Sequence, residues 1–117
     1  MILLYGIPNC DSVKKARAWL QEHNIAFEFV DFKKQAPNAA LIESWLNSIP
    51  LETLLNKRGT TWRKLSDAEK AQADTLAGAI ALMVSQPSII KRPILSLNQQ
   101  HYAGFQAELY QTLFPQQ

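Results

Sequence analysis

The stretch that decides the fold is ILLYGIPNCDSVKKA, residues 2–16. It opens with an apolar run that ends at a glycine, the pattern of a buried strand. Residues 7–9, which include a proline and an asparagine, then favour a turn. From Ser12 onward the apolar residues recur three and four positions apart, which predicts a helix with one polar face. The sequence therefore predicts a strand, a tight turn that carries Cys10, and a helix.

The position of Cys10 has a chemical consequence. The first turn of a helix leaves backbone N–H groups without partners, and their partial positive charge favours a thiolate over a thiol. Lys14, Lys15 and Arg17 add positive potential, whereas Asp11 opposes it unless its carboxylate caps the helix. A lone cysteine is often only a small buried hydrophobic residue. Both interpretations stay open, and position favours the reactive thiol.

Cys10 is the only cysteine in the chain. An internal disulfide is therefore impossible, and Val13 stands where a CxxC motif would have its second cysteine. A single thiolate can still attack a disulfide or an oxidised substrate, but an external thiol must then resolve the product. The sequence thus excludes a dithiol mechanism within this chain.

Apolar patterns along the rest of the chain predict the order of its other elements. Residues 26–32 alternate as a strand does, which completes a strand–helix–strand unit. The middle, about residues 38–86, reads as a helical insert. After it, residues 93–97 and 101–103 predict two strands, and the last residues predict a terminal helix. We expect one α/β domain over residues 1–117.

Local signals mark the helices of the predicted insert. Asn38 is placed to begin the first of them. Ser66 and Glu69 have the spacing of a capping box, in which each side chain satisfies a free backbone donor of the other residue. A further helix is expected from Thr75, with five apolar side chains buried: Leu76, Ala79, Ile80, Met83 and Val84.

Composition narrows the class of protein. The chain has 117 residues, of which 47% are hydrophobic and 19% charged, as in a globular domain. An uncharged run at residues 76–90 is too short and too interrupted to span a membrane. The N-terminus lacks the features of a signal peptide, so we expect a cytoplasmic protein. The net charge of +2 gives no reason to expect a nucleic-acid or membrane partner.

Arg92 and Pro93 precede the predicted third strand. The guanidinium of Arg92 is suited to bind an anion or to stabilise a thiolate; the alternative is a solvated surface arginine. A proline is tolerated as the first residue of a strand, because it forfeits only one hydrogen bond of the ladder. Few X-Pro bonds are cis, so the residues alone predict a trans bond here.

A basic segment lies at residues 57–64. Its cations are Lys57, Arg58, Arg63 and Lys64, and residues 59–61 between them predict a flexible turn rich in hydroxyl groups. Trp62 would offer a stacking surface. Such a loop could receive the carboxylates of a small anionic thiol or a phosphate, although a solvated face is the common alternative.

The two histidines, His23 and His101, are isolated from other potential metal ligands in the sequence. We interpret both as structural and predict no metal site.

Three segments together resemble the arsenate reductase/Spx family, and its short YffB-type branch most closely. They are YGIPNCDSVKKA at residues 5–16, SIIKRPI at residues 88–94 and the weaker GF at residues 104–105. The resemblance implies a thioredoxin-like fold, with a helical insert between a βαβ and a ββα half. It also implies a cis bond before Pro93, which reverses the expectation from the residues alone.

The resemblance assigns roles as well. The family's arsenate reductases use a nucleophilic cysteine, which Cys10 matches, and an anion-binding arginine, which Arg92 matches; glutathione forms a mixed intermediate that glutaredoxin releases. The sequence departs from them where Gly6 replaces a histidine and where Asn56 stands near an expected arginine, with Arg58 two residues later. A third arginine, expected after residue 97, is missing. Spx regulators, which bind RNA polymerase, carry a CxxC switch that this chain lacks.

The resulting hypothesis is a glutathione-dependent thiol reductase or a related thiol-transfer protein. Cys10 and Arg92 would be catalytic, glutathione or another small thiol would be the co-substrate, and no bound cofactor is expected. We expect a monomer. The alternatives are a non-enzymatic Spx-like module that binds a protein partner and, disfavoured by the missing arginines, an arsenate reductase. The predicted substrate-binding residues are Asn9, Lys14, Lys57, Arg58, Arg63 and Pro93.

Overall fold

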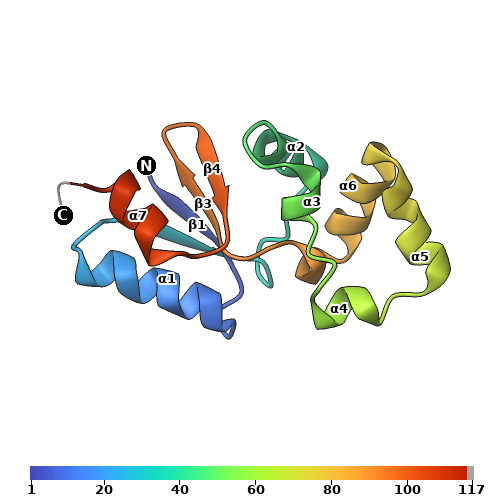
Figure 1. Cartoon of the computed structure of the whole chain (residues 1–117), viewed down its shortest axis with the longest axis horizontal. Coiled ribbons are helices and arrows are strands. Elements are labelled where there is room, and N and C mark those ends of the chain that lie inside the picture. Colours follow the sequence, from blue (N-terminus) through green and yellow to red (C-terminus); the bar gives the residue numbers. More distant parts are fainter. Residues whose placement is uncertain (116–117) are drawn as a thin grey trace. The chain divides into compact units, whose positions relative to one another are not determined.

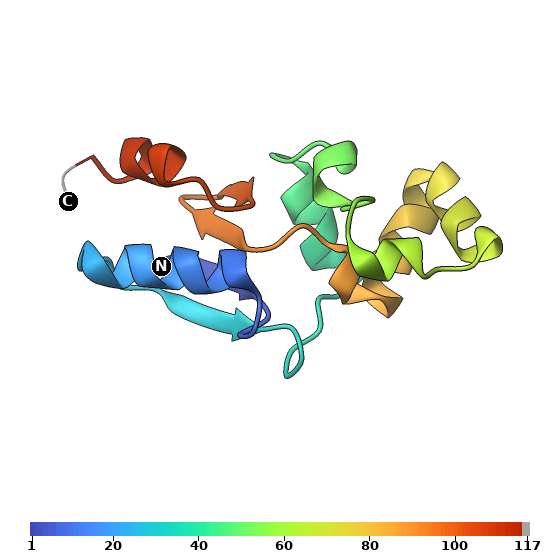
Figure 2. The same ribbon diagram turned by 60° about the horizontal axis from the view of Figure 1, so that its bottom comes forward.

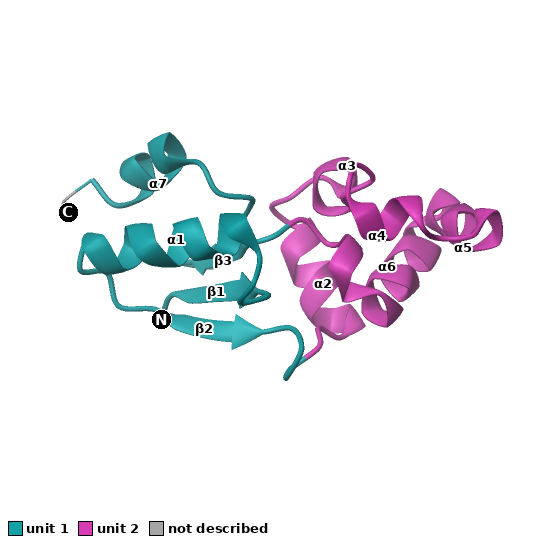
Figure 3. Ribbon diagram, turned by 90° about the horizontal axis from the view of Figure 1, so that it is seen from below, with its two compact units in different colours: residues 1–35, 92–117 teal, residues 36–91 magenta. Residues whose placement is uncertain are grey.

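The computed structural model of the protein describes residues 1–115. The chain folds into two compact units, one made of Met1–Gln35 with Arg92–Gln117 and the other of Ala36–Lys91 (Figure 3). The insert predicted at about 38–86 falls within the second unit. The assignment of the whole chain to a single domain stays a prediction. No helix among residues 1–115 is long and apolar enough to cross a membrane.

The first unit is built on a four-stranded sheet with the strand order β2-β1-β3-β4 (Figure 1). β1 (Leu3–Gly6) pairs in parallel with β2 (Glu28–Asp31), and α1 (Asp11–Glu22) connects them. β3 (Ile94–Leu97) is antiparallel to β1 and pairs with β4 (Gln100–Ala103) through a tight turn. The predicted order of strands and helices is therefore confirmed.

One face of this sheet carries the core of the first unit. Strand register places Leu4 opposite Phe29 and Leu95, and Leu95 opposite Tyr102. Paired residues point to the same side of a sheet, so all four side chains join one cluster. This cluster also holds side chains of α1 and of α7 (Ala107–Leu113), which run alongside the sheet in Figure 2. A βαβ half and a ββα half around one core form the predicted thioredoxin-like fold.

The second unit is helical. Its elements are α2 (Ala39–Leu46), α3 (Leu51–Leu54), α4 (Thr60–Arg63), α5 (Asp67–Ala71), the 3-10 turn η1 (Gln72–Asp74), α6 (Leu76–Ser85) and the 3-10 turn η2 (Pro87–Ile89). Side-chain caps begin three of the helices. Asn38 accepts a hydrogen bond from the N–H of Leu41, Ser66 and Glu69 form the predicted capping box, and Thr75 accepts from Gly78.

The predicted buried face of α6 is partly wrong. Ala79, Ile80 and Met83 are buried, but Leu76 is 57% exposed and Leu82, which was not predicted, is 2% exposed. Apolar residues occur on nearly every side of this helix, so periodicity alone cannot choose which side faces the core. The neighbouring helices make that choice.

Candidate active site

Cys10 is the last residue before α1, as predicted. Its backbone is extended, its N–H donates to the carbonyl of Ile7 at 3.2 Å, and its carbonyl accepts from the N–H of Lys14 at 2.9 Å. These two bonds hold the residue between the turn and the first turn of the helix. The thiol itself makes no capping hydrogen bond and is partly exposed. It is therefore accessible and lies at the positive end of α1.

The surroundings of this thiol lower its pKa. Burial alone raises the pKa of Cys10, but the backbone N–H groups of Val13 and Ser12 and the side chain of Arg92 together outweigh that effect. Arg92 contributes both as a hydrogen-bond donor and through its charge. A lowered pKa increases the thiolate fraction at neutral pH, and the thiolate is the nucleophilic form of cysteine.

The register of the sheet brings Arg92 to Cys10. Tyr5 of β1 pairs with Ile94 of β3 in antiparallel fashion. The residues just before Ile94 therefore lie beside the end of β1, where the chain turns toward Cys10. The bond between Arg92 and Pro93 is cis, as the resemblance implied, so the trans expectation from the residues alone is wrong. Arg92 is partly buried and is not the solvated surface arginine of the alternative interpretation.

Gly6, at the end of β1, and Val13, in the first turn of α1, pack closely against each other. A Cβ atom on Gly6 would lie 2.6 Å from Cγ2 of Val13, whose side chain is fully buried. Carbon atoms normally approach to only about 3.5–4.0 Å. The histidine that the resemblance places at position 6 therefore has no room while Val13 is present. Sequence reasoning noted both residues but did not find that they contact each other.

The other predicted residues of the first unit lie near Cys10 in the chain or beside Arg92. Asn9 is exposed in the turn, and Pro93 is buried at the start of β3. Lys14 is exposed on α1 and lines a shallow hollow of about 210 Å³ together with Arg17. The guanidinium of Arg17 is held over the ring of Phe29, at 4.4 Å from its centroid. This hollow is a cationic surface on α1, the helix that follows Cys10.

Lys57, Arg58 and Arg63 belong to the second unit. Lys57 and Arg58 line a hollow of about 310 Å³, and Lys91, which was not predicted as a site residue, joins them there. Arg63 lies in α4 and does not line this hollow.

Two expectations about the basic segment are wrong. Residues 60–63 form the helix α4, so they are not the flexible turn that was expected. Trp62 is 9% exposed and packs its ring under the ammonium group of Lys57, at 5.4 Å from the centroid. It offers no stacking surface to a ligand, because burial of a large aromatic ring is more favourable than its exposure.

Neither histidine is among the groups that shift the pKa of Cys10. Nδ1 of His23 lies 2.8 Å from the carbonyl oxygen of Trp19. The imidazole of His23 also stacks on the indole ring of Trp19. Burial lowers the pKa of His101. Within residues 1–115, no group of three or more histidine, cysteine, aspartate or glutamate side chains could hold a metal ion.

Comparison with known proteins assigns the family. The model of the ArsC family matches residues 5–113. The chain belongs to the ArsC family. Among similar proteins, an uncharacterized protein of Haemophilus influenzae is 36% identical and covers 97% of this chain and 99% of its own. The global transcriptional regulator Spx of Enterococcus faecalis is 28% identical, covering 98% of this chain and 87% of its own.

Solved structures of ArsC-related proteins share the whole fold. The YFFB (PA3664) protein is 43% identical, with a TM-score of 0.90 over 96% of this chain and 97% of its own. An arsenate reductase (ArsC) related protein of Brucella melitensis is 41% identical, with a TM-score of 0.74 over 97% and 93% of the two chains. Proteins similar to this chain are thus named both for transcriptional regulation and for a relation to arsenate reductase, and the choice between such roles for this chain depends on its site.

Proposed function

We propose that this ArsC-family protein is a glutathione-dependent thiol reductase, or a related thiol-transfer protein, with Cys10 as its nucleophile. The observation that carries the proposal is the environment of Cys10. The thiol is accessible, and both the N–H groups of the first turn of α1 and the side chain of Arg92 lower its pKa. Perturbed pKa values of this kind are common at functional sites.

The reaction follows from the presence of a single cysteine. The Cys10 thiolate attacks one sulfur of a substrate disulfide, forms a mixed disulfide, and releases the other sulfur as a thiolate that takes up a proton. A first glutathione thiolate then attacks the Cys10 sulfur, which releases the second substrate thiol. A second glutathione attacks the resulting adduct, so that oxidised glutathione leaves and the Cys10 thiolate returns. The two electrons that reduce the substrate come from the two glutathione molecules.

Arg92 would stabilise negative charge on sulfur as each disulfide bond breaks, because a guanidinium donates several hydrogen bonds and carries a fixed charge. Glutathione also has two carboxylates. Asn9, Lys14 and Pro93 of the first unit, and Lys57, Arg58 and Arg63 of the second, are the groups that we propose bind it. Among the last three, Lys57 and Arg58 are the stronger candidates, since they share one hollow with the cation of Lys91.

The test measures Cys10 directly. Wild type and Arg92→Ala are incubated with oxidised glutathione, and the adduct on Cys10 is followed by mass spectrometry against time; iodoacetamide alkylation over a range of pH gives the pKa of the thiol. Lys15→Ala is the matched control, since Lys15 is an exposed cation of α1 that does not contribute to the lowered pKa of Cys10. We expect fast adduct formation in wild type and the control, and slow formation in Arg92→Ala. A wild-type pKa at or above about 8.5 would contradict the mechanism.

A second candidate is a protein-interaction module without enzymatic activity. It is favoured by the Spx regulator that aligns with 98% of this chain. In that case Cys10→Ser would bind the same purified partner as wild type with equal affinity, and the glutathione adduct would form slowly whether or not Arg92 is present. Arsenate reduction is tested by arsenate-dependent consumption of glutathione in the presence of glutaredoxin. We expect no such consumption, because Asn56 and the segment after residue 97 lack the expected arginines.

A further inference from the structure

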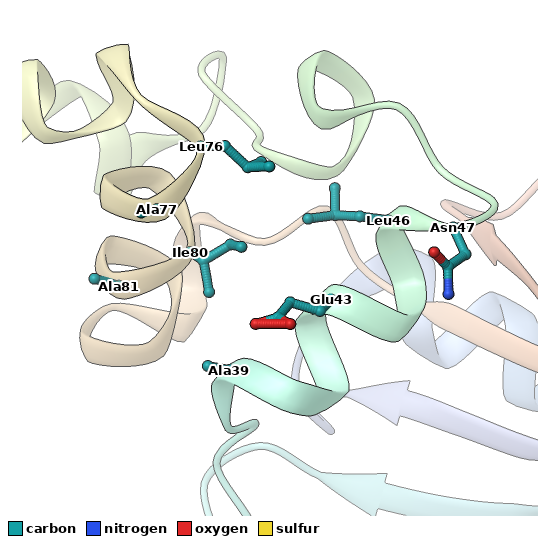
Figure 4. Close-up of a pocket in the computed structure, with 8 residues that line it drawn as sticks. All are labelled: Ala39, Glu43, Leu46, Asn47, Leu76, Ala77, Ile80 and Ala81. Carbon is teal, nitrogen blue, oxygen red and sulfur yellow. The ribbon is translucent and has the colours of Figure 1, made fainter.

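A groove runs between α2 and α6 within the second unit (Figure 4). Its volume is about 650 Å³, in the range of sites that hold ligands. The residues that line it are Ala39, Glu43, Leu46 and Asn47 of α2 and Leu76, Ala77, Ile80 and Ala81 of α6. None of them takes part in the thiol site, so the groove is an independent feature of the molecule.

The groove is apolar and open. Figure 4 shows the side chains of Leu46, Leu76 and Ile80 directed into the space between the two helices. Ala77 and Ala81, with short side chains, leave room along α6. Apart from Met1 at the chain end, Leu76 is the one exposed large hydrophobic side chain within residues 1–115. The exposed apolar surface of the groove is therefore formed by Leu76, the half-buried Leu46 and the exposed alanines around them.

Glu43 gives the groove its charge. It is the only charged residue among the eight that line the groove, and Figure 4 shows its carboxylate in the space between α2 and the side chain of Ile80. An occupant that buries the surrounding leucines would also remove water from this carboxylate. Complementarity therefore requires a cationic group on the occupant, in the middle of an apolar surface.

We propose that this groove docks an amphipathic helix of a partner protein, which carries a lysine or arginine among its apolar side chains. Three lining alanines are exposed, as is Leu76, so the site is too open to enclose most of the surface of a small molecule. α2 has eight residues, a length of about 12 Å that matches about two turns of a docked helix. Leucines at positions i, i+4 and i+7 of the partner helix would contact Leu46, Leu76 and Ile80.

A second copy of this chain is the weaker candidate for the same surface. In a symmetric dimer the same patch of both copies meets at the interface. Two Glu43 carboxylates would then face each other in an apolar environment, which is unfavourable. Charge therefore favours a basic partner over self-association.

The test uses two synthetic alanine-based helical peptides with the same leucine stripe and either lysine or glutamate at position i+3. Each is titrated into the isotope-labelled full chain, and amide shifts are followed by NMR. We expect saturable shifts on α2 and α6, with the lysine peptide bound more tightly than the glutamate peptide, by up to about five-fold, the most that an ion pair with an exposed carboxylate supplies. Glu43→Lys should reverse this preference. Glu22→Lys, which changes an exposed glutamate of α1, should leave it unchanged.

Several outcomes would overturn the proposal. They are equal affinity for the two peptides, shifts that map outside α2 and α6, and no saturable binding of either peptide. Concentration-dependent shifts of these helices without peptide would indicate a second copy as the occupant. Binding of octylammonium as tight as that of the lysine peptide would indicate a small amphiphile. Because Leu76 is exposed, Leu76→Ala should remain folded and bind the lysine peptide several-fold more weakly.

Discussion

Replacing Gly6 with alanine places a methyl group against Val13. The new Cβ atom would lie 2.6 Å from Cγ2 of Val13, 3.4 Å from Cγ1 and 3.6 Å from Cβ. The closest contact is about 1 Å shorter than the preferred separation of carbon atoms. Val13 cannot rotate away freely, because a valine in a helix strongly prefers one rotamer. Either β1 or the first turn of α1 must therefore move.

The effect of Gly6→Ala on the free energy of unfolding can be estimated from two opposing contributions. Overpacking of this kind costs about 1–3 kcal/mol. Alanine restricts the unfolded chain more than glycine does, which stabilises the folded state by about 0.4–1 kcal/mol. Gly6→Ala should therefore lower the free energy of unfolding by roughly 0–2.6 kcal/mol, most plainly if the overpacking is near the upper end of its range. Val13→Ala alone should cost about 2–3 kcal/mol, because it removes two buried methyl groups and leaves a cavity.

The double variant separates this steric explanation from others. In Gly6→Ala/Val13→Ala, the new methyl group occupies space that Cγ2 of Val13 has left. The double variant should therefore be more stable than the sum of the two single changes predicts, by about 1–2 kcal/mol. Urea denaturation followed by circular dichroism measures all four proteins. The steric account fails if Gly6→Ala is stabilising, or if the two changes add to within about 0.5 kcal/mol.

Three further predictions concern single residues. Because the pKa of Cys10 is lowered in the folded state, the contribution of this thiolate to stability is complete above the free-thiol pKa of about 8.5 and is lost as pH falls through the lowered pKa. In urea titrations, the free energy of unfolding of wild type minus that of Cys10→Ser should therefore increase as pH rises. A difference that does not change with pH would contradict this. The hydroxyl of Tyr110 is buried without a hydrogen-bond partner among residues 1–115. Tyr110→Phe should therefore raise the free energy of unfolding by about 1 kcal/mol, as measured by thermal denaturation. A less stable variant would show that the hydroxyl does form a hydrogen bond. Gly78→Ala would place its Cβ 1.9 Å from the carbonyl oxygen of Gln72 and should cost at least about 2 kcal/mol, against about 1 kcal/mol for the control Ala81→Gly on the same helix.

Local features of the chain were predictable because neighbouring residues produce them. The apolar run before Gly6 and the spacing after Ser12 depend on contacts within one strand or one helix. The capping box at Ser66 and Glu69 depends on residues three positions apart, and the structure contains it. The burial of Trp62 was missed, since a polar neighbourhood in sequence does not report which elements pack over a side chain.

The sequence by itself determined that this protein has one thiol, that the thiol precedes a helix, and that no second cysteine can resolve its disulfides. Tertiary structure alone decided what surrounds that thiol. Arg92 reaches Cys10 because β3 pairs with β1 in one register, and the groove at Glu43 exists because α2 packs against α6. Periodicity reports contacts within a single element. Contacts between distant segments depend on strand register and on helix packing, which no local pattern records.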